Sequence, residues 1–499
     1  MSKNKSLYEL IHSMNKNEKR QFKIQAVLHT GGKTNKYVQL FDLFEGIRTF
    51  DESTIQKKAA KAPFIKHFAA EKNYLYQQIL DHLDNYHKES SVDREISKLL
   101  NIGRILMEKK LDDQGVKVLN KARELSLEQN RHENLIPIND LLLRNRFDKE
   151  TMTQQYIDEF HREERNAIKH LNQKLFFKQA FNQLALIRRM HGKITDPTRL
   201  QAITQDFPHL TEPIPSQMHY WDSAVYYFLS LLEFCRLTHN RDLGREAALK
   251  LFQIMESDRS KITGEYIDRY SYALYAFILI HGYQTEEEKN AALDKLRHLD
   301  KYIDSKVTNR EHARTFEYHH TTLTHIYLST KEYHKVWDLL PDFERAEALY
   351  KEHITPSFNV AMHFNIASLF FGNQDYRQSL KWSNKVHNAA LSFRKDIYHY
   401  LRTLVLILHW ELGNIETLKS TAKAVQYYNK KNGVVSEIQN IIIQHSKEWI
   451  KANSRSEKRS LFEQLKTQFE KLSNTPGESL VFEEIDLMGW VNRKCADPV

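Results

Sequence analysis

The stretch NIASLFFGNQDYRQSLKW, residues 365–382, has an apolar run, a short turn containing Gly and Asn, and a second run that mixes apolar and polar residues. Two other stretches share its spacing without gaps: LTHIYLSTKEYHKVWDLL from Leu323 and VLILHWELGNIETLKSTA from Val405. Each begins with an apolar residue, followed by an aromatic residue or His after four positions and an apolar residue after ten. This repetition predicts helical hairpins that stack to form a continuous core.

The pattern resembles the tetratricopeptide repeat (TPR), with residues 365–382 the best match and NIGRILMEKKLDDQGVKVLNKA (101–122) also similar. The spacing departs from that family. Tyr333 and Tyr376 are 43 residues apart, and Tyr376 and Ile415 are 39 apart, whereas the standard repeat has about 34 residues. Longer helices are therefore expected.

The resemblance implies an α-solenoid whose concave groove binds a peptide or protein segment, so that the chain acts as a non-catalytic scaffold or adaptor. In that family, residues of each hairpin's first helix line the groove. The positions that take this role here are Tyr318, Thr321, His325, Phe364, Ser368, Phe371, Tyr400, Thr403 and Trp410.

Composition supports an all-α fold independently. The chain has only 14 Gly and 10 Pro in 499 residues, too few for the frequent tight turns of a sheet protein. Its length exceeds what one hydrophobic core usually serves. The expected parts are a basic helical domain (1–90), a hairpin region with a long helix at about 155–190 (91–205), the TPR-like array (206–475), and a capping helix and tail (476–499).

The N-terminal domain suggests a second function. It carries 15 Lys and Arg against 10 Asp and Glu, within a net charge of +9. A cluster of lysines beside aromatic residues is able to contact phosphates, which leaves open a ligand-responsive regulator that binds nucleic acid. Solvated helix surfaces explain the same charges. The lysines concerned are Lys57, Lys58, Lys61 and Lys66.

The expected compartment is the cytoplasm. The first residues, MSKNKSLYELIHSMNKNEKRQF, lack the apolar segment of a secretory signal. The longest apolar runs are far shorter than the roughly 20 residues of a membrane span. Two cysteines, Cys235 and Cys495, cannot form a disulfide framework.

Little in the sequence indicates chemistry. HTGGKT (29–34) matches only the second half of a P-loop, because Val27 stands where the first glycine belongs. A turn between two helices is the better interpretation. Glu317 and His320 have the spacing of a di-iron ligand pair, but no convincing second copy of that motif exists. We therefore expect no catalytic residue, cofactor or metal site.

The C-terminal SLVFEEIDLMGWVNRK (479–494) is amphipathic, with Val481, Ile485, Met488 and Trp490 expected on one face. Two interpretations remain open. The segment either caps the last hairpin, as solenoids require, or folds into the groove and competes with a ligand. This ending, together with the LIHSMNKNEKRQFK opening, resembles a bacterial group, and that resemblance implies no function.

Overall fold

The computed structural model is helical throughout its described residues, in which no strand occurs. These residues are 3–497 except 29–35, 48–49, 61–66, 87–91, 147–152, 193, 195, 213–219, 263–264, 282–284, 298–308, 388–393, 433 and 476. Residues 1–164 and 165–499 form two compact units. The dividing point lies inside one long helix, and the sequence-based boundary at 206 falls within the second unit.

The first unit contains two separate hydrophobic cores. One is formed by α1 to α5 around Leu40, Phe41 and Phe44. The other is formed by α6 to α8 and the start of α9 around Leu119 and Ile138. The helices are α1 (Lys3–Ser13), α2 (Lys16–Leu28), α3 (Lys36–Glu45), α4 (Glu52–Ala59), α5 (Phe68–Tyr86), α6 (Val92–Glu108), α7 (Asp112–Glu128) and α8 (Leu135–Arg146).

Helices α6 and α7 form the hairpin expected around residues 101–122. They approach closely at Gly103, where an added Cβ would lie 2.5 Å from a methyl group of Leu119. Arg123 of α7 then pairs in a bidentate manner with Glu163 of α9, at 2.8 and 2.9 Å. The hairpin is therefore fixed by a glycine contact on one side and a charged pair on the other.

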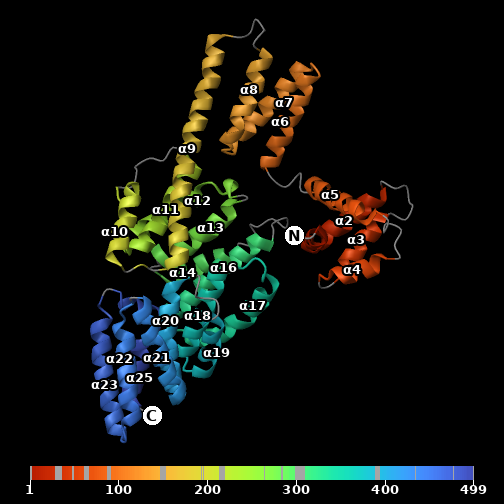
Figure 1. Ribbon diagram of the computed structural model, residues 1–499. Helices are drawn as coiled ribbons and strands as arrows, with labels where there is room; N and C mark the ends of the chain where they lie inside the picture. Colours follow the sequence, from red (N-terminus) through yellow and green to blue (C-terminus); the bar gives the residue numbers. More distant parts are fainter. Residues whose placement is uncertain are drawn as a thin grey trace. The chain divides into compact units, whose positions relative to one another are not determined.

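The second unit is a succession of helical hairpins (Figure 1). Its helices are α9 (Gln154–His191, the part from 165), α10 (Pro197–Asp206), α11 (Trp221–Thr238), α12 (Arg241–Ser257), α13 (Glu265–Ala276), α14 (Glu286–Arg297), α16 (Asn309–Ser329), α17 (Val336–Leu349), α18 (Pro356–Gly372), α19 (Tyr376–His387), α20 (Lys395–Glu411), α21 (Ile415–Asn432), α22 (Glu437–Lys451), α23 (Arg455–Leu472), α24 (Ser479–Glu484) and α25 (Leu487–Ala496).

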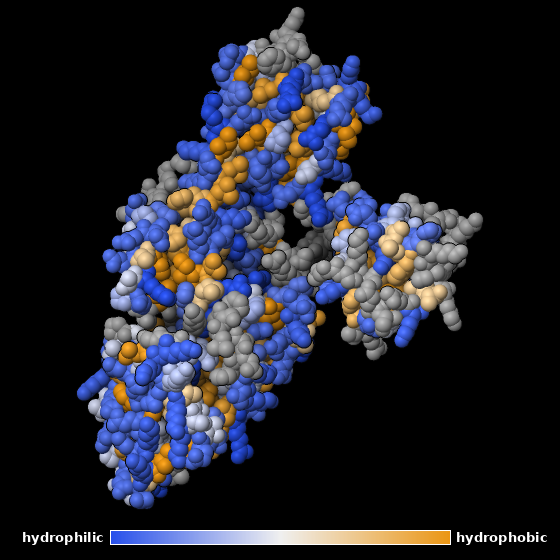
Figure 2. All heavy atoms as spheres, in the orientation of Figure 1, coloured by the Kyte–Doolittle hydropathy of each residue, from blue (hydrophilic) through white to orange (hydrophobic). Residues whose placement is uncertain are grey.

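The first helix of one hairpin packs against the first helix of the next. Thus α13 contacts α16, α16 contacts α18, α18 contacts α20, and α20 contacts α22. Within hairpins, α18 packs on α19 and α20 on α21. In Figure 2 the visible face over α22 and α23 is mostly hydrophilic. We call the side of this row of first helices that faces α9 and the C-terminal segment the inner face.

Sequence explains the burial of the central helices. The α18 sequence PSFNVAMHFNIASLFFG contains no Lys, Arg, Asp or Glu, and a helix that is apolar all round becomes buried all round. Leu323 and Tyr327 of α16 pack against the hydrophobic clusters on both sides of them. The apolar interior is therefore continuous along the second unit.

Several expectations are confirmed at this level. The long helix expected at about 155–190 is α9, which has 38 residues. The three repeated stretches form α16 and α17, α18 and α19, and α20 and α21. Within the described chain, no helix combines the length and hydrophobicity needed to cross a membrane.

Candidate functional site

The C-terminal segment, residues 479–497, lies along α20 on the inner face. Near the first turn of α20, Glu484 approaches Arg394. Burial lowers the pKa of Arg394, but the carboxylates of Asp396 and Glu484 outweigh this effect and hold it above its ordinary value. At the other end, the Trp490 ring contacts Trp410 with centroids 5.6 Å apart. The segment thus follows α20 from its start to its end.

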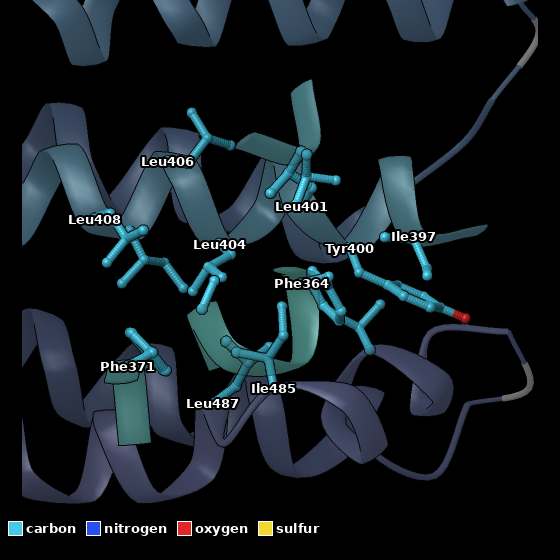
Figure 3. Close-up of a cluster of buried hydrophobic side chains, with 14 of the residues drawn as sticks. Phe364, Phe371, Ile397, Tyr400, Leu401, Leu404, Leu406, Leu408, Ile485 and Leu487 are labelled. Atoms are coloured by element: carbon cyan, nitrogen blue, oxygen red, sulfur yellow. The ribbon is translucent and has the colours of Figure 1, made fainter. Parts of the chain in front are cut away.

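Apolar side chains anchor this segment. Ile485 and Leu487 point from it toward Leu404 and the rings of Phe364 and Phe371 (Figure 3). Trp490 is fully buried, and burial of a large aromatic ring makes a major contribution to packing. The buried anchors are Val481, Ile485, Leu487, Trp490 and Val491.

Polar contacts around Glu411 fix the orientation of the segment. The indole N–H of Trp490 donates to Glu411 Oε1 at 2.8 Å. The ammonium group of Lys494 lies 2.7 Å from Oε2 of the same carboxylate. Because Glu411 is almost completely buried, these contacts are worth more than surface ion pairs.

The expected single helix is broken in the middle of the segment. Ile485 is extended, and Asp486 caps α25 by accepting from the backbone N–H of Gly489 at 3.1 Å. For this reason Leu487 is buried, whereas Met488 is only partly buried. The expected apolar face is correct for the other three residues.

The earlier hairpins present a different inner face, with a charged network in place of apolar anchors. Glu233 of α11 is 1% exposed, accepts from Arg188 of α9, and accepts from the Tyr272 hydroxyl at 2.8 Å. Arg236 lies 3.9 Å from Glu233. Burial raises the pKa of Glu233, but Arg188 and Arg236 outweigh burial, so the pKa is below its ordinary value.

Aromatic hydroxyls extend this network toward α16. Arg236 donates to the Tyr275 hydroxyl at 3.0 Å and to the Tyr272 hydroxyl at 3.3 Å. The Tyr318 ring lies 5.8 Å from each of these tyrosine rings. We call Arg188, Glu233, Arg236, Tyr272, Tyr275 and Tyr318 the arginine–tyrosine network.

Glu317 and His320 of α16, the residues with di-iron spacing, have structural contacts. Glu317 pairs with Arg314 at 2.6 Å and accepts from the backbone N–H of Thr355 at 2.6 Å, at the start of α18. Burial lowers the pKa of His320 to about 3. No group of three or more potential ligands that could hold a metal ion occurs in the described part of the chain.

The nine groove residues expected from the TPR resemblance divide between the two faces. Those on α16 are partly exposed, and Tyr318 belongs to the arginine–tyrosine network. Those on α18 and α20 are buried, and Phe364, Phe371, Tyr400 and Trp410 belong to the same hydrophobic cluster as the C-terminal anchors. The α16 set is Tyr318, Thr321 and His325; the buried set is Phe364, Ser368, Phe371, Tyr400, Thr403 and Trp410. Whether any of them contacts a partner stays a prediction.

The N-terminal lysines and the glycine turn are only partly described. Lys57 and Lys58 are exposed in the last turn of α4, whereas Lys61 and Lys66 lie outside the described residues. The turn in HTGGKT also lies outside them, between the end of α2 at Leu28 and the start of α3 at Lys36.

Sequence reasoning missed Arg188, Glu233 and Arg236. A signal was present, because Glu233 and Arg236 interrupt the otherwise apolar YYFLSLLEFCRL of α11 three residues apart. Charged residues on an apolar helix require partners. Their partners on α9 and α13 are far away in sequence, and only the fold brings them together.

Comparisons with known proteins identify no relative. No protein-family model matches the chain, and neither a curated protein nor a solved structure is similar to it.

Proposed function

We propose that the chain is a non-catalytic scaffold or adaptor, and that its second unit is a TPR-like α-solenoid whose inner face binds a peptide or protein segment. One observation carries this proposal: the inner face already holds a peptide-like segment of its own chain. Residues 479–497 run along α20 with apolar anchors and with polar contacts at Glu411. Buried anchors surrounded by oriented polar groups are typical of peptide recognition.

The partner segment would bind on the neighbouring inner face, next to α13 and α16. There Tyr318 offers an aromatic anchor, while Thr321 and His325 are partly exposed on the same helix. The Arg236 side chain, about a quarter exposed, would donate to carboxylates or backbone carbonyls of the segment.

Binding accounts for the charged groups better than catalysis does. Glu233 is held by Arg188, Arg236 and Tyr272, and Glu317 by Arg314 and Thr355, so each carboxylate is committed to several donors. Burial raises the pKa of Cys235 to about 12, which keeps its thiol protonated at neutral pH and weakly nucleophilic.

Affinity purification from the source cells, with and without nuclease, tests the function. We expect a discrete, nuclease-resistant protein partner that the Tyr318→Ala variant no longer recovers. Thr321→Glu is the second variant, because it adds charge to the same face without removing a packed ring. Tyr427→Ala, which changes an exposed tyrosine on the outer helix α21, is the matched control and should retain the partner.

Two results would contradict the proposal. Recovery of the same partner by both inner-face variants, at wild-type melting temperature, would exclude the inner face. Partners that disappear after nuclease treatment, together with loss of binding in a Lys57→Glu, Lys58→Glu variant, would favour the nucleic-acid alternative.

A further inference from the structure

A second surface, independent of the inner face, lies on the outer side of α9. Five large hydrophobic side chains between residues 165 and 191 are 36% to 59% exposed. At 100° per residue, Ile168, Leu175 and Leu186 fall within about 20° of one another around the helix axis. They form a stripe rather than scattered exposures. The exposed set is Ile168, Leu175, Phe176, Leu186 and Met190.

The opposite side of α9 is packed firmly. Ala167, Phe177, Ala180 and Leu184 are buried, and the Ser230 hydroxyl of α11 donates to the carbonyl of Phe177 at 2.8 Å. The stripe is therefore presented by a helix whose orientation is already fixed. Exposed apolar patches on a rigid element commonly mark interaction sites.

Charge on this part of α9 has one sign. From Arg165 to His191 the sequence contains six Lys and Arg and no Asp or Glu. Lys174 and Arg188 pair with Asp222 and Glu233 of α11, so they face inward.

The positions beside the stripe are neutral or basic. Arg165, Lys169 and Arg189 are exposed next to it, and uncharged Asn172, Gln179, Asn182 and Gln183 separate its apolar residues. A partner would therefore meet apolar surface bordered by positive charge.

We propose that the outer face of α9 from 165 to 191 binds an amphipathic helix with acidic flanks from a protein partner. Apolar positions of that helix would cover Leu175, Phe176 and Leu186, and its carboxylates would lie opposite Arg165, Lys169 and Arg189. A second copy of this chain fits less well, because its α9 would bring the same positive charges to the contact.

A designed peptide tests this proposal with the full chain. The probe is a fluorescent 20-residue helix with leucines at positions i, i+3, i+4 and i+7 and glutamates on its flanks. Its binding is followed by anisotropy. We expect saturable binding that weakens with added salt, and at least about tenfold weaker binding to a Leu175→Ser, Leu186→Ser variant. Both leucines are exposed, so this variant should keep the wild-type melting temperature.

Three controls make the result decisive. A peptide of the same composition in scrambled order, and one with lysine in place of glutamate, should each bind at least about tenfold more weakly. The proposal is overturned if the double serine variant binds the probe as tightly as wild type, or if the scrambled peptide does. Self-association of the wild-type protein that disappears in the variant would also overturn it, in favour of a second copy.

Discussion

The inner face of α11, α13 and α16 and the inner face of α18, α20 and α22 belong to the same succession of hairpins but differ in chemistry. The first carries the arginine–tyrosine network. The second is apolar and is covered by the C-terminal segment. The same succession of hairpins thus contains a largely buried charged network and an apolar face covered by its own chain.

The difference arises in the first helices themselves. Helix α11 places Glu233 and Arg236 among apolar residues, whereas α18 has no charged residue. An apolar inner face must be covered, and the C-terminal segment, residues 479–497, covers it. On the first inner face the charged groups and tyrosine hydroxyls satisfy one another.

The largest expected effect comes from uncovering the apolar face. Trp490→Ala should lower the free energy of unfolding by about 3 to 5 kcal/mol, because it removes a fully buried ring and leaves a cavity. Urea denaturation measures this. The matched control, Trp337→Ala on α17, removes a half-exposed ring and should cost about 1 kcal/mol. Equal losses would show that the C-terminal segment is not anchored as described.

The stability of the arginine–tyrosine network should fall when one residue of its ion pairs is removed. Glu233→Ala removes the buried carboxylate that Arg188 and Arg236 share and leaves both partly buried arginines without it, which should cost about 3 kcal/mol. Adding Arg236→Ala should recover part of this loss in a double-mutant cycle. The exposed pair Glu416 and Lys419 is the control, and its cycle should show no measurable coupling.

A glycine lies where the end of α9 closely approaches the start of α20. Gly192, at the end of α9, has φ +69°, and a Cβ there would lie 1.9 Å from the carboxyl carbon of Asp396 at the start of α20. Gly192→Ala should therefore cost about 2 kcal/mol or more. Gly413→Ala, with φ +66° and no neighbour within 4 Å, should cost only about 1 kcal/mol. Equal melting temperatures for the two variants would exclude the contact.

Acid should destabilise both faces through buried neutral histidines. Burial lowers the pKa of His320 on α16 to about 3 and that of His399 on α20 to about 4. Between these values and about 6.5 the unfolded chain binds protons that the folded chain does not, so stability falls as pH decreases through this range. Each histidine contributes up to about 1.4 kcal/mol per pH unit. His320→Gln should reduce the slope, whereas exposed His334→Gln should not.

The helices were predictable from the sequence, but the tertiary contacts between them were not. The absence of Gly and Pro from about 155 to 190 predicts α9, and the spacing from Leu323 onward predicts the hairpins. Resemblance placed Phe364 and Trp410 on a groove, but spacing contains no information that the chain's own C-terminal segment would lie over them. The pairing within the arginine–tyrosine network could not be predicted, because Arg188 and Glu233 are 45 residues apart in the sequence.

The most direct test asks whether the inner face binds a peptide. A protease site inserted between Ser473 and Glu478 allows the segment to be cut from the folded full chain. A fluorescent synthetic peptide of residues 479–499 is then added. The account predicts that the peptide exchanges into the cleaved protein and co-elutes with it in size exclusion, while a Trp490→Ala peptide does not. Irreversible unfolding on cleavage, or a folded core that rebinds neither peptide, would contradict it.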